Sequence, residues 1–193
     1  MASSTVTHAS RLRDRADTKR RIHDIKRWLA IQLQTERLSL RPHRADDWAA
    51  VGAYANHPGL LRYQPDDVRS PEQMQAHLQH LVAAQQREPR TSYHFAIILE
   101  ANQRLIGWCG LSIKDRERQI AELGYDHDRT CWGMGYMTEA ARAVIGWGFT
   151  TLKLHRIFAE CHPANAASIR VMQKLGMTYE GHLRENVWVK GSW

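Results

Sequence analysis

The chain has 193 residues, 43% of them hydrophobic, which is enough to bury one sizeable core and so to form one main domain. Its longest apolar runs, such as 95–99, fall far short of the roughly 20 residues that cross a bilayer, and no signal peptide is evident, so we expect a cytoplasmic protein without membrane contact. Three widely spaced cysteines without a Cys-x-x-Cys pair predict neither a disulfide framework nor a structural zinc site.

The formal net charge of +7 is concentrated at the start of the chain. Residues 1–27 hold eight Lys or Arg against three Asp, a net of +5, which leaves +2 for everything that follows. The segment 1–33 is therefore predicted to be a basic extension with a disordered start and then a helix. We interpret it either as a solvated tail or as a weak, salt-sensitive contact to ribosomal or other RNA through residues 11–27.

The first part of the domain, which spans 34–193, has the pattern of short α/β elements. Alternation of apolar and polar residues over 37–41 predicts a strand, and Pro42 ends it. A helix is expected over 45–55, up to the turn-forming residues 56–59.

The middle of the chain predicts a helix followed by an antiparallel meander. Ser70 is suited to cap a helix whose first position is Pro71, and this helix is expected to continue to about residue 86. The three extended runs that follow are separated by short turns, which favours antiparallel pairing. They cover 93–99, 105–113 and 119–126.

Between 129 and 140 the sequence changes to a loop with two glycines and then to a helix. Apolar residues at helical spacing up to Gly148 would face a sheet, and the first helical turn is expected near Gly135. N–H groups at a helix start have no intrahelical partner and carry the positive end of the dipole, so they attract anions. Glycines allow close approach, which makes a diphosphate the expected guest, although a plain tight turn also explains a Gly-x-Gly pair alone.

The residues Trp-Gly-Met-Gly-Tyr-Met-Thr-Glu-Ala at 132–140 resemble the acetyl-CoA loop of GNAT acetyltransferases, and within them the RimJ and RimL branch of ribosomal-protein N-terminal acetyltransferases. The general superfamily pattern is Gln/Arg-x-x-Gly-x-Gly/Ala. Gly135 matches its central glycine, whereas Trp132 and Met137 replace its first and last residues, as is familiar in this branch. The resemblance implies that backbone N–H groups hold the pyrophosphate at Gly133, Met134, Gly135, Tyr136, Met137 and Thr138.

A second segment of the family pattern lies downstream. A strand is predicted over 155–162, followed by His-Pro-Ala-Asn-Ala-Ala-Ser at 162–168 and a helix that ends before Gly176. Asn165 is suited to cap this helix, and Gly176 can supply the left-handed residue after it. The resemblance, which extends over 34–193, implies that Asn165 also contacts the pantetheine arm.

The predicted chemistry is direct attack of an amine on the acetyl thioester, which requires a base, an oxyanion donor and an acid for the leaving thiolate. Glu122 lies close to the place where the resemblance puts a catalytic Glu, so it is the first candidate for the base and would act through water. An outward-facing carboxylate or a structural ion pair explains Glu122 equally well. Glu185, on a later predicted strand, is the reserve candidate.

The acid and the oxyanion donor are also assigned from the resemblance. Many GNAT enzymes use a Tyr on the helix after the Asn motif as the acid, and this chain has Met172 there. In the RimL-like branch a serine three positions after the Asn takes this role, and Ser168 occupies that position; a serine that merely sits on the helix surface is the alternative. The oxyanion donor is expected to be an N–H of the strand 123–126, freed by an irregularity at Gly124. The strand residues expected beside acetyl-CoA are Leu123, Gly124 and Tyr125.

Together these segments predict an α/β (α+β) domain with the GNAT fold, a mixed and mostly antiparallel central sheet with helices on both faces. Residues 177–190 are predicted to form a strand that enters a turn at 191–192. Relatives continue into a returning strand, so we expect the final strand to be missing and the domain 34–193 to be C-terminally truncated, with an adhesive edge. No metal site is expected, because His77 and His80 on one helix have no third ligand at zinc-site spacing.

The sequence therefore predicts an enzyme, an acetyl-CoA-dependent N-acetyltransferase that acetylates a primary amine. A protein N-terminal α-amine is the expected acceptor, and a small-molecule amine is the alternative. A non-catalytic acyl-CoA-binding module with an RNA-contacting arm, and a purely RNA-binding protein, are the competing hypotheses. We expect a monomer or a homodimer.

Overall fold

The computed structural model describes residues 31–65, 67–191 and 193. The basic extension predicted over 1–33 lies almost wholly outside this range, as does the RNA contact predicted for 11–27. Ile31 and Leu33 are described, and both pack against the main core. No helix in the described ranges is long and apolar enough to span a bilayer.

The described strands form one sheet with the order β1-β2-β3-β4-β5-β6. All neighbouring pairs are antiparallel except β5 and β6, which are parallel. The predicted mixed, mostly antiparallel sheet is therefore confirmed. The strands are β1 (Leu33–Gln34), β2 (Leu38–Pro42), β3 (Ser92–Leu99), β4 (Arg104–Asp115), β5 (Ile120–His127) and β6 (Arg156–Phe158).

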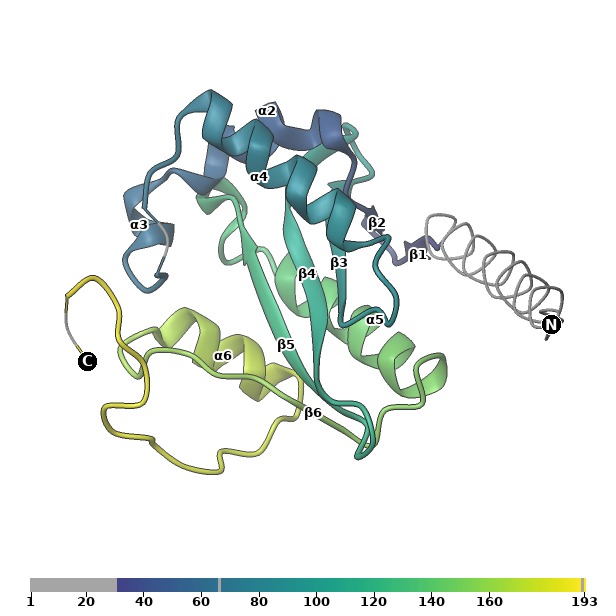
Figure 1. The fold of residues 1–193 in the computed structure, drawn as a ribbon, viewed down its shortest axis with the longest axis vertical. Coiled ribbons are helices and arrows are strands. Elements are labelled where there is room, and N and C mark those ends of the chain that lie inside the picture. The colour runs from purple at the N-terminus through teal and green to yellow at the C-terminus, as the bar shows by residue number, and fades with distance from the viewer. Residues whose placement is uncertain (1–30, 66, 192) are drawn as a thin grey trace, which may run out of the picture.

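The helices cover both faces of this sheet, as predicted. Helices α2 and α4 lie on one face and α5 lies on the other (Figure 1). The short α3 begins where the sequence predicted only a turn, because His57 accepts a hydrogen bond from the Gly59 N–H and Pro58 fits a first helical position. The helices are α2 (Trp48–Ala55), α3 (Pro58–Leu61), α4 (Pro71–Ala84), α5 (Tyr136–Thr150) and α6 (Ala166–Lys174), with 3-10 turns η1 (Ala45–Asp47) and η2 (Arg129–Cys131).

The larger core lies between the sheet and α5. Helical spacing brings the apolar face of α5 against alternate strand residues, and burying each large apolar side chain contributes roughly 1.5–3 kcal/mol. A second core lies under α2 and α4. The larger core includes Leu38, Leu40, Phe95, Ile97, Ile106, Leu111, Met137, Ala141 and Val144.

The strand predicted over 177–190 is wrong. In the structure these residues form neither a helix nor an extended strand, apart from an isolated bridge at Val189. Much of the segment is exposed, Tyr179 and Leu183 included, and a strand without a partner gains no ladder hydrogen bonds. Glu185 consequently lies in a turn, with a φ of 51°, rather than on a strand.

Candidate functional site

β5 and β6 separate after a short paired stretch. Their register covers Ile120 with Arg156, Ala121 with Ile157 and Glu122 with Phe158, and β5 then continues alone on this side to His127. The strand predicted over 155–162 is accordingly only three residues long in the structure. Alternate N–H groups of β5 turn away from β4, so beyond Glu122 they face the opening between the two strands.

The far side of this opening is formed by the start of α6. Asn165 caps the helix, because its Oδ1 accepts a hydrogen bond of 3.1 Å from the Ser168 N–H. The Tyr125 hydroxyl of β5 donates to the Ser168 carbonyl at 3.3 Å, and burial raises the pKa of Tyr125 to about 12. The structure therefore brings together Tyr125, Asn165 and Ser168, three of the residues that the sequence predicted for the site.

The glycine loop forms the start of α5, and β5 leads into it through residues 128–135. Gly133 and Gly135 have φ angles of 79° and 82°, a left-handed conformation that only glycine adopts at little cost. The first bond of the helix ladder runs from the Glu139 N–H to the Gly135 carbonyl at 3.0 Å. The N–H groups of residues 136–138 therefore precede the ladder and lie at the positive end of the helix dipole.

The loop is open where an anion would approach. A Cβ at Gly133 would meet nothing within 4 Å, and a Cβ at Gly135 would meet only the tip of the Arg37 guanidinium, at 3.5 Å. Met137 is buried with its side chain in the core, so it offers only its backbone to this surface. These features suit a diphosphate held by backbone N–H groups.

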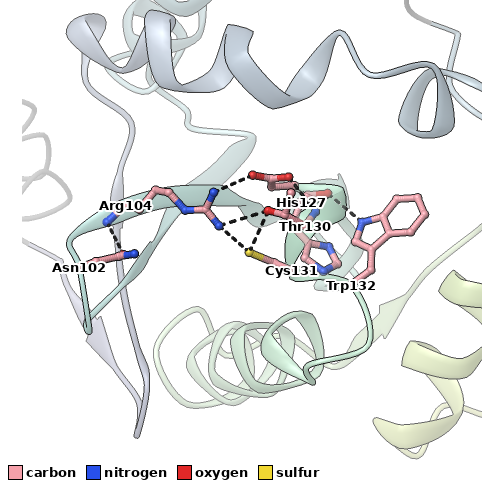
Figure 2. Close-up of polar contacts among 7 residues, drawn as sticks. Asn102, Arg104, His127, Thr130, Cys131 and Trp132 are labelled. Carbon is pink, nitrogen blue, oxygen red and sulfur yellow. Dashed lines mark hydrogen bonds and ion pairs between the residues drawn. The ribbon is translucent and has the colours of Figure 1, made fainter.

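Arg104 of β4 fixes the turn that leads into this loop (Figure 2). Its guanidinium pairs with Asp128 at 3.1 Å and donates to the Cys131 Sγ at 3.0 Å. Trp132, at the first position of the loop pattern, donates from its indole N–H to the His127 carbonyl at 3.0 Å. Trp132 therefore has a structural contact of its own that ties the loop to the end of β5.

A second tie, between Arg37 and Glu139, was not foreseen from the sequence. The Glu139 carboxylate, in the first turn of α5, accepts from the Thr35 hydroxyl at 2.6 Å, the Arg37 N–H at 2.9 Å and the Arg37 Nε at 2.7 Å. Arg37 also donates to the Met134 carbonyl at 3.0 Å and stacks over Tyr136. Thr35 and Arg37 lie in the turn between β1 and β2. We call Thr35, Arg37 and Glu139 the β2–α5 clamp, because they anchor the glycine loop to the β1–β2 hairpin. A hydrogen-bond network between residues so distant in sequence leaves no local pattern.

The side chains of Glu122 and Tyr125 lie on opposite faces of β5. Its carboxylate forms a 2.6 Å ion pair with Lys114, and its side chain is 29% exposed. The neighbouring Gly124 is paired in register with Gly110, so the irregularity predicted there is wrong. Packing favours glycine here instead, since a Cβ at position 124 would lie 3.0 Å from the Trp108 ring, which would have to shift. Beyond Glu122, backbone N–H groups of β5 are freed by the separation of β5 and β6 and not by a bulge.

A family model described as the acetyltransferase (GNAT) domain matches residues 37–178. The chain belongs to the GNAT acetyltransferase family. The protein p20 of Bacillus licheniformis, an uncharacterized N-acetyltransferase, is 34% identical over 163 residues that cover 82% of this chain and 89% of the relative. The ribosomal protein uS5-alanine N-acetyltransferase of Escherichia coli is 27% identical over 169 residues, 84% of this chain and 86% of the relative.

The fold of this GNAT protein agrees with a solved relative. The crystal structure of a GNAT-family acetyltransferase from Bacillus anthracis, 29% identical, has a TM-score of 0.74 and covers 84% of this chain and 93% of that chain. The predicted family, fold and resemblance to ribosomal-protein acetyltransferases are confirmed, and the protein is an acetyltransferase enzyme. Among the residues that the structure describes, no group of three or more His, Cys, Asp or Glu is placed to hold a metal ion.

Proposed function

We propose that this GNAT protein transfers the acetyl group of acetyl-CoA to a primary amine. The observation that carries the proposal is the open, left-handed glycine loop at the start of α5, where the N–H groups of residues 136–138 precede the helix ladder. This loop follows β5 at the end where β5 has separated from β6. An anion site and an opening in the sheet therefore lie in succession along one strand, which suits a long ligand with a diphosphate at one end.

The proposed binding roles follow from the hydrogen-bonding atoms that each group does not use within the fold. The backbone N–H groups of 133–138 would hold the pyrophosphate. Asn165 uses its Oδ1 in the helix cap, so its Nδ2 is the atom left to donate to the pantetheine arm. Leu123, Gly124 and Tyr125 would flank the acetyl group through their backbone, on the edge of β5 that β6 has left.

The catalytic roles rest on Glu122, Ser168 and the β5 backbone. The thioester supplies an activated acetyl group. Glu122 would take a proton from the acceptor amine through water, an N–H of 123–126 would donate to the developing oxyanion, and the Ser168 hydroxyl would protonate the leaving thiolate. The Lys114 ammonium, 2.6 Å from Glu122, keeps a cation beside this carboxylate.

The acceptor we favour is the α-amine of a protein N-terminus. The support is the uS5-alanine N-acetyltransferase of Escherichia coli, which matches over 84% of this chain. A small-molecule amine is the second candidate. The two candidates can be distinguished by measuring release of the CoA thiol with two acceptors. One is a peptide with a free N-terminal alanine, and the other is a short aliphatic diamine.

The role of Glu122 can be separated from its ion pair by two substitutions. Glu122→Gln removes the base and the ion pair together, whereas Lys114→Met removes the ion pair and keeps the carboxylate. If Glu122 is the base, the first lowers kcat by about 100-fold and the second retains most of the activity. Equal losses in both variants would show that the ion pair, and not a base, is what matters. Glu117→Gln, in an exposed turn, is the control.

A further inference from the structure

Asp126 is a second carboxylate on the same face of β5 as Glu122. It pairs in register with Trp108 of β4, as Glu122 pairs with Ser112. Four residues along a strand correspond to about 13 Å, and Gly124, which has no side chain, lies midway. The two carboxylates therefore flank Gly124, against which the Trp108 ring packs, on the stretch of β5 that the proposed function places beside the acetyl group.

The surroundings of Asp126 are those of a buried acid without a cation. Its Oδ1 is buried and has no hydrogen-bond partner among residues 31–65, 67–191 and 193. Its Oδ2 accepts one long hydrogen bond, 3.4 Å, from the Gln64 side chain. Burial raises the pKa of Asp126, and the nearby polar groups of Trp108, Gln64 and Tyr54, together with the His43 ring, offset this only in part.

Three other carboxylates with limited exposure each have a cation beside them. Asp47 is held by two hydrogen bonds from Arg41, at 2.8 and 2.7 Å, and Glu122 and Glu139 pair with Lys114 and Arg37. Buried charges are normally paired, because desolvation of an isolated ion is costly. Within the described part of the chain, no Lys or Arg forms an ion pair with Asp126, and the one nearby residue that can carry a positive charge is His43, which lowers its pKa without an ion pair. A cation from outside would therefore supply the close partner that Asp126 lacks.

The reaction provides such a cation. An aliphatic primary amine is mainly an ammonium ion at neutral pH, and this ion must lose one proton before its lone pair can attack and a second afterwards. Glu122 accounts for one of these protons in the proposed function. We propose that Asp126 is the acceptor-recognition residue, which binds the incoming ammonium group and accepts its first proton.

The proton balance of this step is simple, and the inference rests on the proposed function. One N–H bond of the ammonium breaks, one O–H bond forms on the Asp126 carboxyl, and the amine becomes neutral. The buried site favours this exchange because both products are uncharged, whereas both reactants are ions. The acceptor class that follows is a cationic primary amine. Amines that are already neutral in water should gain nothing from Asp126.

Asp126→Asn tests the inference with two acceptors, a peptide with a free N-terminal alanine and aniline, which is unprotonated at pH 7.5. For the peptide we expect a fall in kcat/KM of about 100-fold, restored in part by Asp126→Glu, and for aniline little change. Asp67→Asn, at an exposed aspartate that lies 3.8 Å from Lys190, should leave both rates unchanged. Equal losses for the two acceptors, or no loss for either, would overturn the assignment.

A second readout needs no turnover. In CoA-saturated protein labelled with ¹³C at aspartate carboxyls, the Asp126 signal should move when the peptide is added at pH 7.5. A signal that does not respond overturns the inference. Failure of the proposed function looks different, because acetyl-CoA would then leave the melting temperature of both wild type and Asp126→Asn unchanged.

Discussion

The β2–α5 clamp predicts that Glu139→Gln destabilises the protein although it preserves the size of the side chain. In the wild type, Oε1 accepts from Thr35 and from the Arg37 N–H, while Oε2 faces the Arg37 guanidinium. An amide can replace Oε1 with a neutral oxygen. Its NH₂ group must then face the guanidinium, donor against donor, so the charge-assisted bond is lost.

The expected magnitude is moderate because the clamp is only partly shielded. Hydrogen bonds to charged groups contribute about 1.5–3 kcal/mol, but the Arg37 side chain is 42% exposed whereas Glu139 is 18% exposed, so solvent screening lowers the value. We expect a loss of about 1–2 kcal/mol, which for a domain of this size lowers the melting temperature by about 3–6 °C.

The difference should also depend on pH. Burial alone would raise the pKa of Glu139, but hydrogen bonds from Thr35 and Arg37 outweigh it and lower the pKa below its ordinary value. The ionised carboxylate therefore stabilises the fold above the unfolded pKa of about 4.3, and this stability is lost as the pH falls through the folded pKa. The melting temperatures of wild type and variant should therefore converge as the pH falls from about 4.3 through this lowered folded pKa.

The assay is thermal unfolding followed by circular dichroism, with Glu180→Gln as the matched control. Glu180 also forms an ion pair with an arginine, Arg156, but on the surface. The same chemical change should leave its melting temperature unaltered within error. Coincident melts of the two variants at pH 7 would refute the reasoning, because the clamp would then be no more than a surface ion pair.

Three glycines and one histidine give further predictions. By urea unfolding, Gly135→Ala should cost about 1 kcal/mol because of its left-handed φ, whereas Gly146→Ala, in open space within α5, should stabilise by about 0.5–1 kcal/mol. Gly148→Ala, two residues on, should be less favourable than Gly146→Ala, since its Cβ would lie 2.7 Å from a Leu111 methyl group that must then move; equal effects at 146 and 148 would contradict the packing. Burial lowers the pKa of His94 to about 4, so stability should fall as the pH drops from about 6.5 toward 4, and His94→Gln should flatten this profile.

Elements with local signals could be predicted from the sequence. Ser70 caps α4 by accepting from the Gln73 N–H, with Pro71 in the first turn, and Asn165 caps α6 in the same way. Gly176 has the left-handed conformation, φ 77°, that was expected after α6. In each case the determining contacts lie within a few residues, so the pattern carries them.

Features that depend on distant partners could not be predicted. The β2–α5 clamp joins residues 102 positions apart, and Asp126 reads as an ordinary strand residue until Gln64 and Tyr54 are seen to enclose it. The strand predicted over 177–190 failed for the same reason, because an extended run is stable only with a neighbour to pair with. The glycine loop was found because its pattern is contiguous, whereas the roles of Glu122 and Ser168 remain predictions.

The most direct test of acetyl-CoA binding at the glycine loop is a thermal melt with and without acetyl-CoA, on wild type and on Gly135→Asp. At about 100 times its dissociation constant, a ligand adds about 2.7 kcal/mol, so wild type should melt about 5–10 °C higher. Gly135→Asp, which puts a negative charge beside the N–H groups of α5, should lose most of this shift. A cooperative wild-type melt that acetyl-CoA does not move would contradict the account.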